Sequence, residues 1–287
     1  MLEDPSLPEI KFIPPELFSE VGDGAVENAS PDDWEKAIEY HDIKRRITDP
    51  KKRESIRASA IKAIIHKAMS TMGAVSRPQR VDIGPWENNV LGDLDLESTL
   101  DDDPHLNNPL VETKTHKRAE VLVCIDTSLS MTGKKLALTA VSLAVIALQL
   151  EPEDLAVIAF ETEGTLIKPL GKALPLAETL KMFLEVPARG LTNIEAGLKE
   201  TIKEARRGHI KKQAIILMTD GRFTAGKNPE YLIRGLPKLH VVQTGNPWAS
   251  PRFCRNLARL GGGKHIRISK PEHLPKALYS LVHEIVR

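Results

Sequence analysis

Residues 121–130 read VLVCIDTSLS, and this stretch decides the fold. Five apolar residues are followed at once by the carboxylate of Asp126 and by the hydroxyls of Ser128 and Ser130. A run that is apolar at every position predicts a strand buried on both faces, which is typical of parallel sheets. Oxygen donors at the carboxyl end of such a strand are suited to binding a small divalent cation.

Apolar runs and amphipathic stretches alternate from residue 119 to residue 287. The sequence predicts strands at 120–126, 154–160, 213–219, 238–244 and 265–269, and an antiparallel edge strand at 165–170. It predicts helices at 134–150, 176–184, 193–206, 251–260 and 271–286. This alternation indicates an α/β fold, with a Rossmann-like, mostly parallel sheet that carries helices on both faces.

The first 118 residues follow a less regular pattern. Residues 1–30 are rich in proline and acidic residues and are expected to form an extended arm. Residues 51–72 space their apolar side chains as one face of a helix requires, so an amphipathic helix is predicted there. We therefore expect a mainly helical N-terminal region at 1–118, followed by an α/β domain at 119–287.

The composition is that of an ordinary globular protein. Lys and Arg number 40 against 39 Asp and Glu, so no overall charge attracts nucleic acid or a membrane surface. Cys124 and Cys254 have no neighbour at metal-ligand spacing and are expected to be reduced, buried thiols. The N-terminus lacks the basic and apolar segments of a signal peptide, which predicts a cytoplasmic protein without a membrane partner.

Two further segments complete a set of oxygen donors. Thr192 follows Gly190 and opens a predicted helix, and Asp220 ends the predicted strand at 213–219. Because the carboxyl ends of parallel strands meet at one edge of a sheet, Asp126 and Asp220 are expected to converge on one crevice. The hydroxyls and carboxylates, together with water, would form a suitable oxygen shell for Mg²⁺ or Mn²⁺.

The pattern Asp-x-Ser-x-Ser, then Thr, then Asp resembles the metal-ion-dependent adhesion site (MIDAS) of von Willebrand factor A (VWA) domains. All five positions are present without a departure: Asp126, Ser128, Ser130, Thr192 and Asp220. The resemblance implies that the three hydroxyls touch the metal, while the two carboxylates act directly or through water. It also implies that the open metal position takes a carboxylate from a partner protein, so no catalytic residue and no organic cofactor are expected.

Two shorter strings resemble one branch of that family. They are SMTGKKLA at 130–137 and LDLESTL at 94–100. Both are similar to segments of intracellular prokaryotic VWA proteins of the magnesium-chelatase and carbon-monoxide-dehydrogenase-accessory types. Such proteins work with a MoxR-like or chelatase-like AAA+ ATPase in metal insertion or complex maturation. The resemblance therefore implies a non-enzymatic adaptor that binds a separate AAA+ ATPase or its client.

Other interpretations of the same residues stay open. Asp126 could cap the following helix without a metal, or a metal could only stabilise loops in a structural subunit. A haloacid-dehalogenase-like phosphatase also places Asp after its first strand, but it needs a second Asp where this chain has Ser128. The basic residues at 44–57 could contact RNA, as in Ro-type proteins that contain a VWA domain. We expect instead a solvated or acid-paired helix face without nucleic acid.

Overall fold

The computed structural model describes residues 49–73, 79–86, 93–103, 105, 107–128, 133–187, 190–245 and 251–287. Its centre is a six-stranded sheet in the order β6-β5-β4-β7-β8-β9. The strands are β4 (Glu120–Asp126), β5 (Leu155–Phe160), β6 (Gly164–Lys168), β7 (Gln213–Thr219), β8 (Lys238–Thr244) and β9 (Gly262–Ile268). Neighbouring strands are parallel except β5 and β6, which are antiparallel as the sequence predicts.

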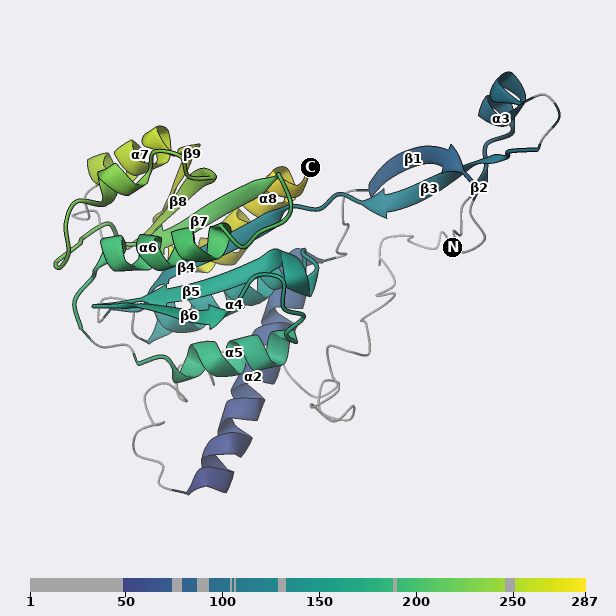
Figure 1. Cartoon of the computed structure of the whole chain (residues 1–287). Coiled ribbons are helices and arrows are strands. Elements are labelled where there is room, and N and C mark those ends of the chain that lie inside the picture. Colours follow the sequence, from purple (N-terminus) through teal and green to yellow (C-terminus); the bar gives the residue numbers. More distant parts are fainter. Residues whose placement is uncertain are drawn as a thin grey trace, which may run out of the picture.

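Helices cover both faces of this sheet (Figure 1). One face carries α2 (Pro50–Met72), α4 (Lys134–Ala147), α5 (Leu176–Glu185) and α8 (Leu274–Val286), and the other carries α6 (Ile194–Ala205) and α7 (Pro251–Leu260). Successive residues of β4 point to opposite faces, so Val123 packs in the first core and Cys124 in the second. The predicted α/β fold, with a mostly parallel sheet between helices, is confirmed.

Helix α4 lies deepest in the first core. Each of its residues from Leu136 to Ile146 is buried, because the sheet lies on one side and α2 and α8 lie on the other. Helix α2 begins at the N-cap Asp49, whose side chain accepts a hydrogen bond from the Lys51 amide at 3.0 Å. It comes from the N-terminal part of the chain but shares the core with α4 and α8. The division of the chain at residue 118 stays a prediction.

A second, three-stranded sheet stands away from the α/β domain (Figure 1). Its antiparallel strands, in the order β1-β3-β2, are β1 (Gln79–Pro85), β2 (Asp93–Leu94) and β3 (Leu110–His116), and α3 (Leu96–Asp102) follows β2. We call this unit, residues 79–116, the projecting sheet. Its strands were not predicted from the sequence. Among its side chains that the structure describes, only Thr99 and Val111 are buried, so no strong apolar alternation marks them.

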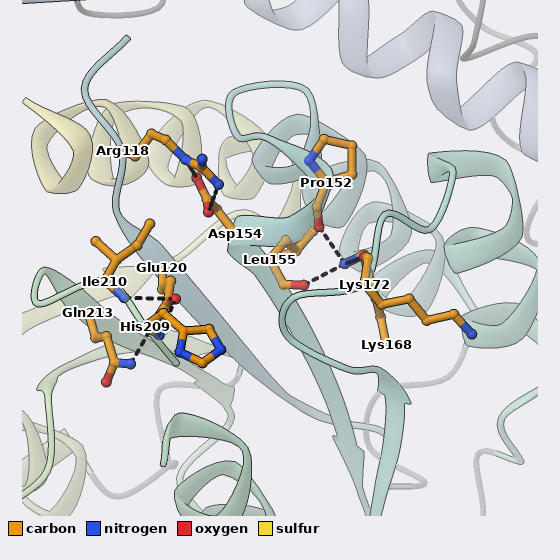
Figure 2. A network of polar contacts seen from close by, with 10 residues as sticks. All are labelled: Arg118, Glu120, Pro152, Asp154, Leu155, Lys168, Lys172, His209, Ile210 and Gln213. Atoms are coloured by element: carbon orange, nitrogen blue, oxygen red, sulfur yellow. Dashed lines mark hydrogen bonds and ion pairs between the residues drawn. The ribbon is translucent and has the colours of Figure 1, made fainter. Parts of the chain in front are cut away.

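Buried polar groups fasten the edge of the main sheet where β4 and β5 begin (Figure 2). The Lys168 side chain is only 1% exposed, and its ammonium donates hydrogen bonds to the carbonyls of Pro152, Leu155 and Lys172. Burial lowers the pKa of Lys168 to about 8. Lys168 therefore ties the end of β6 to the start of β5 and to the short η5 helix (Pro152–Asp154).

The beginning of β4 is held by a second set of contacts at the same edge (Figure 2). Glu120 is buried, and its Oε1 accepts hydrogen bonds from the backbone amides of His209 at 2.8 Å and Ile210 at 3.1 Å. Its Oε2 accepts one from Gln213 Nε2 at 2.6 Å. These bonds satisfy a carboxylate that would otherwise be costly to bury, and they join β4 to the segment that leads into β7.

Candidate metal centre

The candidate site lies at the opposite edge of the sheet, where the central strands end. Strand β4 ends at Asp126, and Asp220 directly follows β7, which lies beside β4. Strand β4 has β5 on one side and β7 on the other. The chain therefore adds β5 and β6 on one side of β4 and β7, β8 and β9 on the other, and the strand order reverses at β4. Ligands of open α/β sheets bind at such a reversal, beyond the carboxyl ends of the strands.

Asp126 is fully buried and both of its carboxylate oxygens accept hydrogen bonds. Oδ1 accepts from the Ser128 amide at 3.0 Å, and Oδ2 accepts from Thr219 Oγ1 at 2.8 Å. Burial raises the pKa of Asp126 to about 6, hydrogen bonds from Ser128 and Thr219 oppose the rise, and the charge of Asp220 adds to it. The two carboxylates are therefore close enough to repel one another, and a cation would offset that repulsion.

Thr192 is held in the turn before α6. Gly190 in this turn has φ +95°, and a Cβ there would lie 2.6 Å from Thr162 Oγ1, so the turn favours glycine. Asn193 donates its amide to the Glu161 carbonyl at 2.7 Å, and its side chain caps α6 by accepting from the Ala196 amide at 3.1 Å. These contacts fix the backbone on both sides of the Thr192 hydroxyl.

The loop after β7 is bonded to the same turn. The Thr192 amide donates to Thr224 Oγ1 at 3.0 Å, while the amides of Thr224 and Ala225 donate to the Thr192 carbonyl at 2.9 and 3.2 Å. The Asp220 side chain accepts from the Arg222 amide at 3.0 Å at the start of this loop. The turn that carries Thr192 and the loop that follows Asp220 therefore hold one another in place through hydrogen bonds.

Glu195 in the first turn of α6 strengthens this pairing. Its carboxylate accepts hydrogen bonds from the Lys227 amide at 2.6 Å and from the Tyr231 hydroxyl, and it forms an ion pair with Lys199 at 2.7 Å. The bonds from Lys199, Tyr231 and Lys227 lower the pKa of Glu195 to about 2. Glu195 thus stays ionised and anchors the far end of the loop that starts at Asp220.

Four of the five predicted metal ligands lie among the described residues, and Ser130 lies outside them. Asp126 and Ser128 are hydrogen-bonded, and the charge of Asp220 acts on Asp126. Thr192 is joined through Thr224 to the loop that follows Asp220. We refer to these five positions together, Asp126, Ser128, Ser130, Thr192 and Asp220, as the candidate metal site.

The chemistry of these donors fits a hard cation. Within the described ranges, no group of three or more His, Cys, Asp or Glu residues could hold a metal ion. A metal would therefore depend on hydroxyl oxygens together with the two carboxylates. Such a set suits Mg²⁺ or Mn²⁺, which prefer oxygen ligands. Because hydroxyls are neutral, they leave part of the cation's charge uncompensated, and that charge attracts an anion from outside the site.

Three further residues support this site and were not predicted from the sequence: Glu195, Thr219 and Thr224. Thr219 directly precedes Asp220, so a hydroxyl at the carboxyl end of an apolar strand was a usable signal. Thr224 and Glu195 gave no such signal. Their roles depend on the loop after β7 folding back against α6, which no local pattern in the sequence predicts.

The match to a known family covers the central strands of this arrangement. Residues 121–222 match the family model of the von Willebrand factor type A domain. The fold around these residues is that of a VWA domain. VWA domains are typically interaction modules rather than enzymes, and they commonly mediate metal-dependent protein–protein interaction through a MIDAS.

Similar proteins agree with this assignment. The chain shares 26% identity over 180 residues with the uncharacterized protein YfbK of Escherichia coli K12, covering 58% of this chain but only 31% of that relative. A solved von Willebrand factor type A structure from Catenulispora acidiphila has TM-score 0.51 at 16% identity and covers 75% of this chain and 51% of that one. Proximal thread matrix protein 1 of the mussel byssus also has TM-score 0.51, at 19% identity, covering 58% and 48%. These structures share the fold.

In the part of the chain that the structure describes, no helix has both the length and the apolar character that spanning a bilayer requires. The basic residues Arg53 and Arg57 of α2 form ion pairs with Glu185 of α5. This portion of the basic stretch is therefore acid-paired, as the sequence analysis expects.

Proposed function

We propose that this VWA protein is a metal-dependent protein-binding adaptor. Its Mg²⁺ or Mn²⁺ would be held by Ser128, Ser130 and Thr192, with the carboxylates of Asp126 and Asp220 acting directly or through water. The metal supplies an electrophilic position that a carboxylate of a partner protein can occupy. The residues of the chain orient the donors and keep them together, and no bond in the partner is made or broken.

The observation that carries this proposal is the convergence of two carboxylates on the carboxyl edge of the sheet. Asp126 and Asp220 come from adjacent strands, and the turn at Thr192 is bonded to the loop after Asp220. Leu191 beside Thr192 and Phe223 in the loop after β7 are exposed by 52% and 39%. Apolar side chains next to a carboxylate-binding position support protein binding, because apolar contacts supply much of the affinity of protein interfaces.

We propose further that the partner is a MoxR-like or chelatase-like AAA+ ATPase, or a client of that ATPase in metal insertion or complex maturation. The strings at 130–137 and 94–100 support this choice through their resemblance to such adaptors. A cytoplasmic location follows from the same resemblance.

One observation favours a second function, in which the metal only stabilises the loops of a structural subunit. Both carboxylate oxygens of Asp126 accept hydrogen bonds from the protein itself, so this part of the site is satisfied without a metal. In that case metal removal would lower the melting temperature and leave partner binding unchanged, because a ligand that binds only the native state stabilises it by mass action.

Metal binding is tested by calorimetric titration of Mg²⁺ and Mn²⁺ into the wild type and the Ser128→Ala/Ser130→Ala variant. We expect the variant to bind at least about tenfold more weakly, because two of the donors are removed. Ser280→Ala is the control, since Ser280 is an exposed residue of α8 whose hydroxyl bonds only to the Lys276 carbonyl. Equal affinity of all three proteins would show that the two serines hold no metal.

Partner binding is tested by affinity capture from the native lysate in Mg²⁺ or EDTA, with the bound proteins identified by mass spectrometry. We expect an AAA+ ATPase to be captured by the wild type in Mg²⁺ and lost with either EDTA or Ser128→Ala/Ser130→Ala. Partners that are captured equally in Mg²⁺ and EDTA, and equally by the wild type and the double variant, would favour the structural-subunit function instead.

A further inference from the structure

The projecting sheet exposes more large apolar side chains than its size predicts. Ten such side chains are exposed among the described residues, and half of them lie on this unit: Ile83, Trp86, Leu94, Leu96 and Leu100. Their exposed fractions range from 44% to 55%. Exposed large apolar side chains that gather on one small unit are typical of an interaction site.

The same unit is strongly acidic. Residues 93–103 contain six carboxylates and no Lys or Arg. Two of these carboxylates accept hydrogen bonds from nearby backbone amides. Asp95 caps α3 by accepting from the Ser98 amide, and Asp103 accepts from amides in the turn after α3. Glu97, Asp101 and Asp102 are exposed instead. They give the unit an outward-facing negative surface.

The apolar and acidic side chains form adjacent rows on α3. Leu96 and Leu100 are four residues apart, and so are Glu97 and Asp101, so each pair lies on one line along the helix. The surface therefore offers a carboxylate directly beside a leucine. The candidate metal site offers the complementary pair, a carboxylate-binding position beside the exposed Leu191 and Phe223.

The projecting sheet cannot reach the metal site of its own chain. Strand β3 leads into β4 at Glu120, whereas Asp126 lies at the other end of β4. Seven residues of strand separate the two ends by roughly 20 Å, and the projecting sheet extends away from the edge where β4 begins (Figure 1). A contact between these two surfaces must therefore join different molecules.

We propose that the projecting sheet of one copy of this chain docks on the candidate metal site of a second copy. Glu97, Asp101 or Asp102 supplies the carboxylate, and Leu96 and Leu100 pack against Leu191 and Phe223. This inference rests on the proposed function, and it names a second copy of the chain as a partner. Because the two surfaces differ, the contact is head-to-tail and builds an open chain or a closed ring.

The test is sedimentation velocity of the full chain over a range of concentrations, in Mg²⁺ and in EDTA. We expect the wild type to form concentration-dependent oligomers in Mg²⁺ and to be monomeric in EDTA. The acidic variant Glu97→Gln/Asp101→Asn/Asp102→Asn and the site variant Ser128→Ala/Ser130→Ala should each be monomeric in both. The control Glu54→Gln/Glu284→Gln removes exposed carboxylates from α2 and α8 and should oligomerise like the wild type.

An equimolar mixture of the acidic variant and the site variant gives the decisive result. The wild-type projecting sheet of one can dock on the wild-type metal site of the other, so the mixture should form a 1:1 complex in Mg²⁺ only. This outcome does not depend on how the mutated helix folds, because the acidic variant contributes only its metal site. A mixture that stays monomeric, or an acidic variant that oligomerises like the wild type, would overturn the inference.

Calorimetry separates this failure from failure of the proposed function. If the acidic variant and the wild type both bind Mg²⁺ but the wild type stays monomeric, the partner is not a second copy of this chain. The metal site is then left for other partners. If the wild type binds no Mg²⁺ and stays monomeric, both the proposed function and this inference are wrong.

Discussion

Lys168 is only 1% exposed and lies at the edge of the sheet opposite the candidate metal site. Replacing it in Lys168→Met leaves three carbonyls, of which that of Leu155 is buried, without their donor. We expect a loss of about 2 kcal/mol of unfolding free energy at pH 7. The control Lys172→Met changes an exposed side chain and should stay within about 0.5 kcal/mol of the wild type.

The deficit of Lys168→Met should also grow with pH. The pKa of Lys168 is about 8 in the folded chain, below the ordinary value of 10.5, so the unfolded chain binds more protons between these values. Unfolding free energy of the wild type therefore rises with pH in this window, by about 2 kcal/mol between pH 8 and pH 10. Urea unfolding of both proteins at each pH measures the difference, and a constant deficit would show that Lys168 does not titrate in this range.

Residues of the candidate site could be predicted from the sequence where they directly follow a recognisable apolar strand. Asp126 and Asp220 stand at the ends of apolar strands, so their position at one edge of the sheet follows from the strands themselves. Thr224 and Glu195 act through contacts between segments about thirty residues apart. Only the folded chain brings these groups together, and the sequence alone does not identify them.

The loop after β7 provides a test at the scale of an element. Gly226 has φ +78°, and a Cβ there would lie 2.2 Å from the Asn193 Oδ1 that caps α6. Gly235 has a similar φ of +83°, but a Cβ there would meet nothing within 4 Å. Both alanine variants carry the same backbone strain, about 1–2 kcal/mol. Gly226→Ala should lose about 1 kcal/mol more, because the cap is disturbed.

Metal affinity should separate the two glycine variants further. The loop that contains Gly226 is bonded to Thr192, so Gly226→Ala should weaken Mg²⁺ binding while Gly235→Ala should not. Chemical denaturation and calorimetric titration of the pair measure both effects. Equal stability and equal affinity of the two variants would show that the loop does not position Thr192.

The elements themselves were predicted best where burial is complete. Strands β4 and β7 match the predicted ranges because every interior position is apolar. Strand β8 also matches, although its interior includes His240 and Gln243. Strand β9 begins at Gly262, three residues before the predicted start, because Gly262 and Gly263 lack the apolar side chains by which a strand is recognised in a sequence. A Cβ on Gly263 would lie 2.1 Å from the Leu239 carbonyl, so glycine lets β9 approach β8. That requirement comes from the neighbouring strand in the folded protein, so no pattern in the local sequence indicates it.

At the scale of the whole molecule, the two edges of the main sheet have different roles. The edge where β4 begins is stabilised by the buried side chains of Glu120 and Lys168 (Figure 2). It also carries the ion pair between Arg118 and Asp154, in which Arg118 Nη2 lies 2.6 Å from Asp154 Oδ1. The opposite edge carries the candidate metal site. Stability and binding are therefore expected to be separable by mutation.

Glu120→Ala tests this separation. The variant leaves the His209 and Ile210 amides and the Gln213 side chain without their acceptor, so we expect a loss of about 2–3 kcal/mol of unfolding free energy. Its folded fraction should bind Mg²⁺ with wild-type affinity at 10 °C. A lower affinity in Glu120→Ala would mean that the two edges are coupled through β4.

The two native cysteines bear on how this molecule can be followed in solution. Cys124 and Cys254 are each fully buried, and burial raises the pKa of both thiols to about 12. Reagents such as maleimides react with the thiolate, so neither native cysteine will consume them while the chain is folded. A cysteine introduced away from both proposed docking surfaces, for example in Ser280→Cys at an exposed position of α8, can thus carry one fluorophore per chain in an otherwise wild-type background.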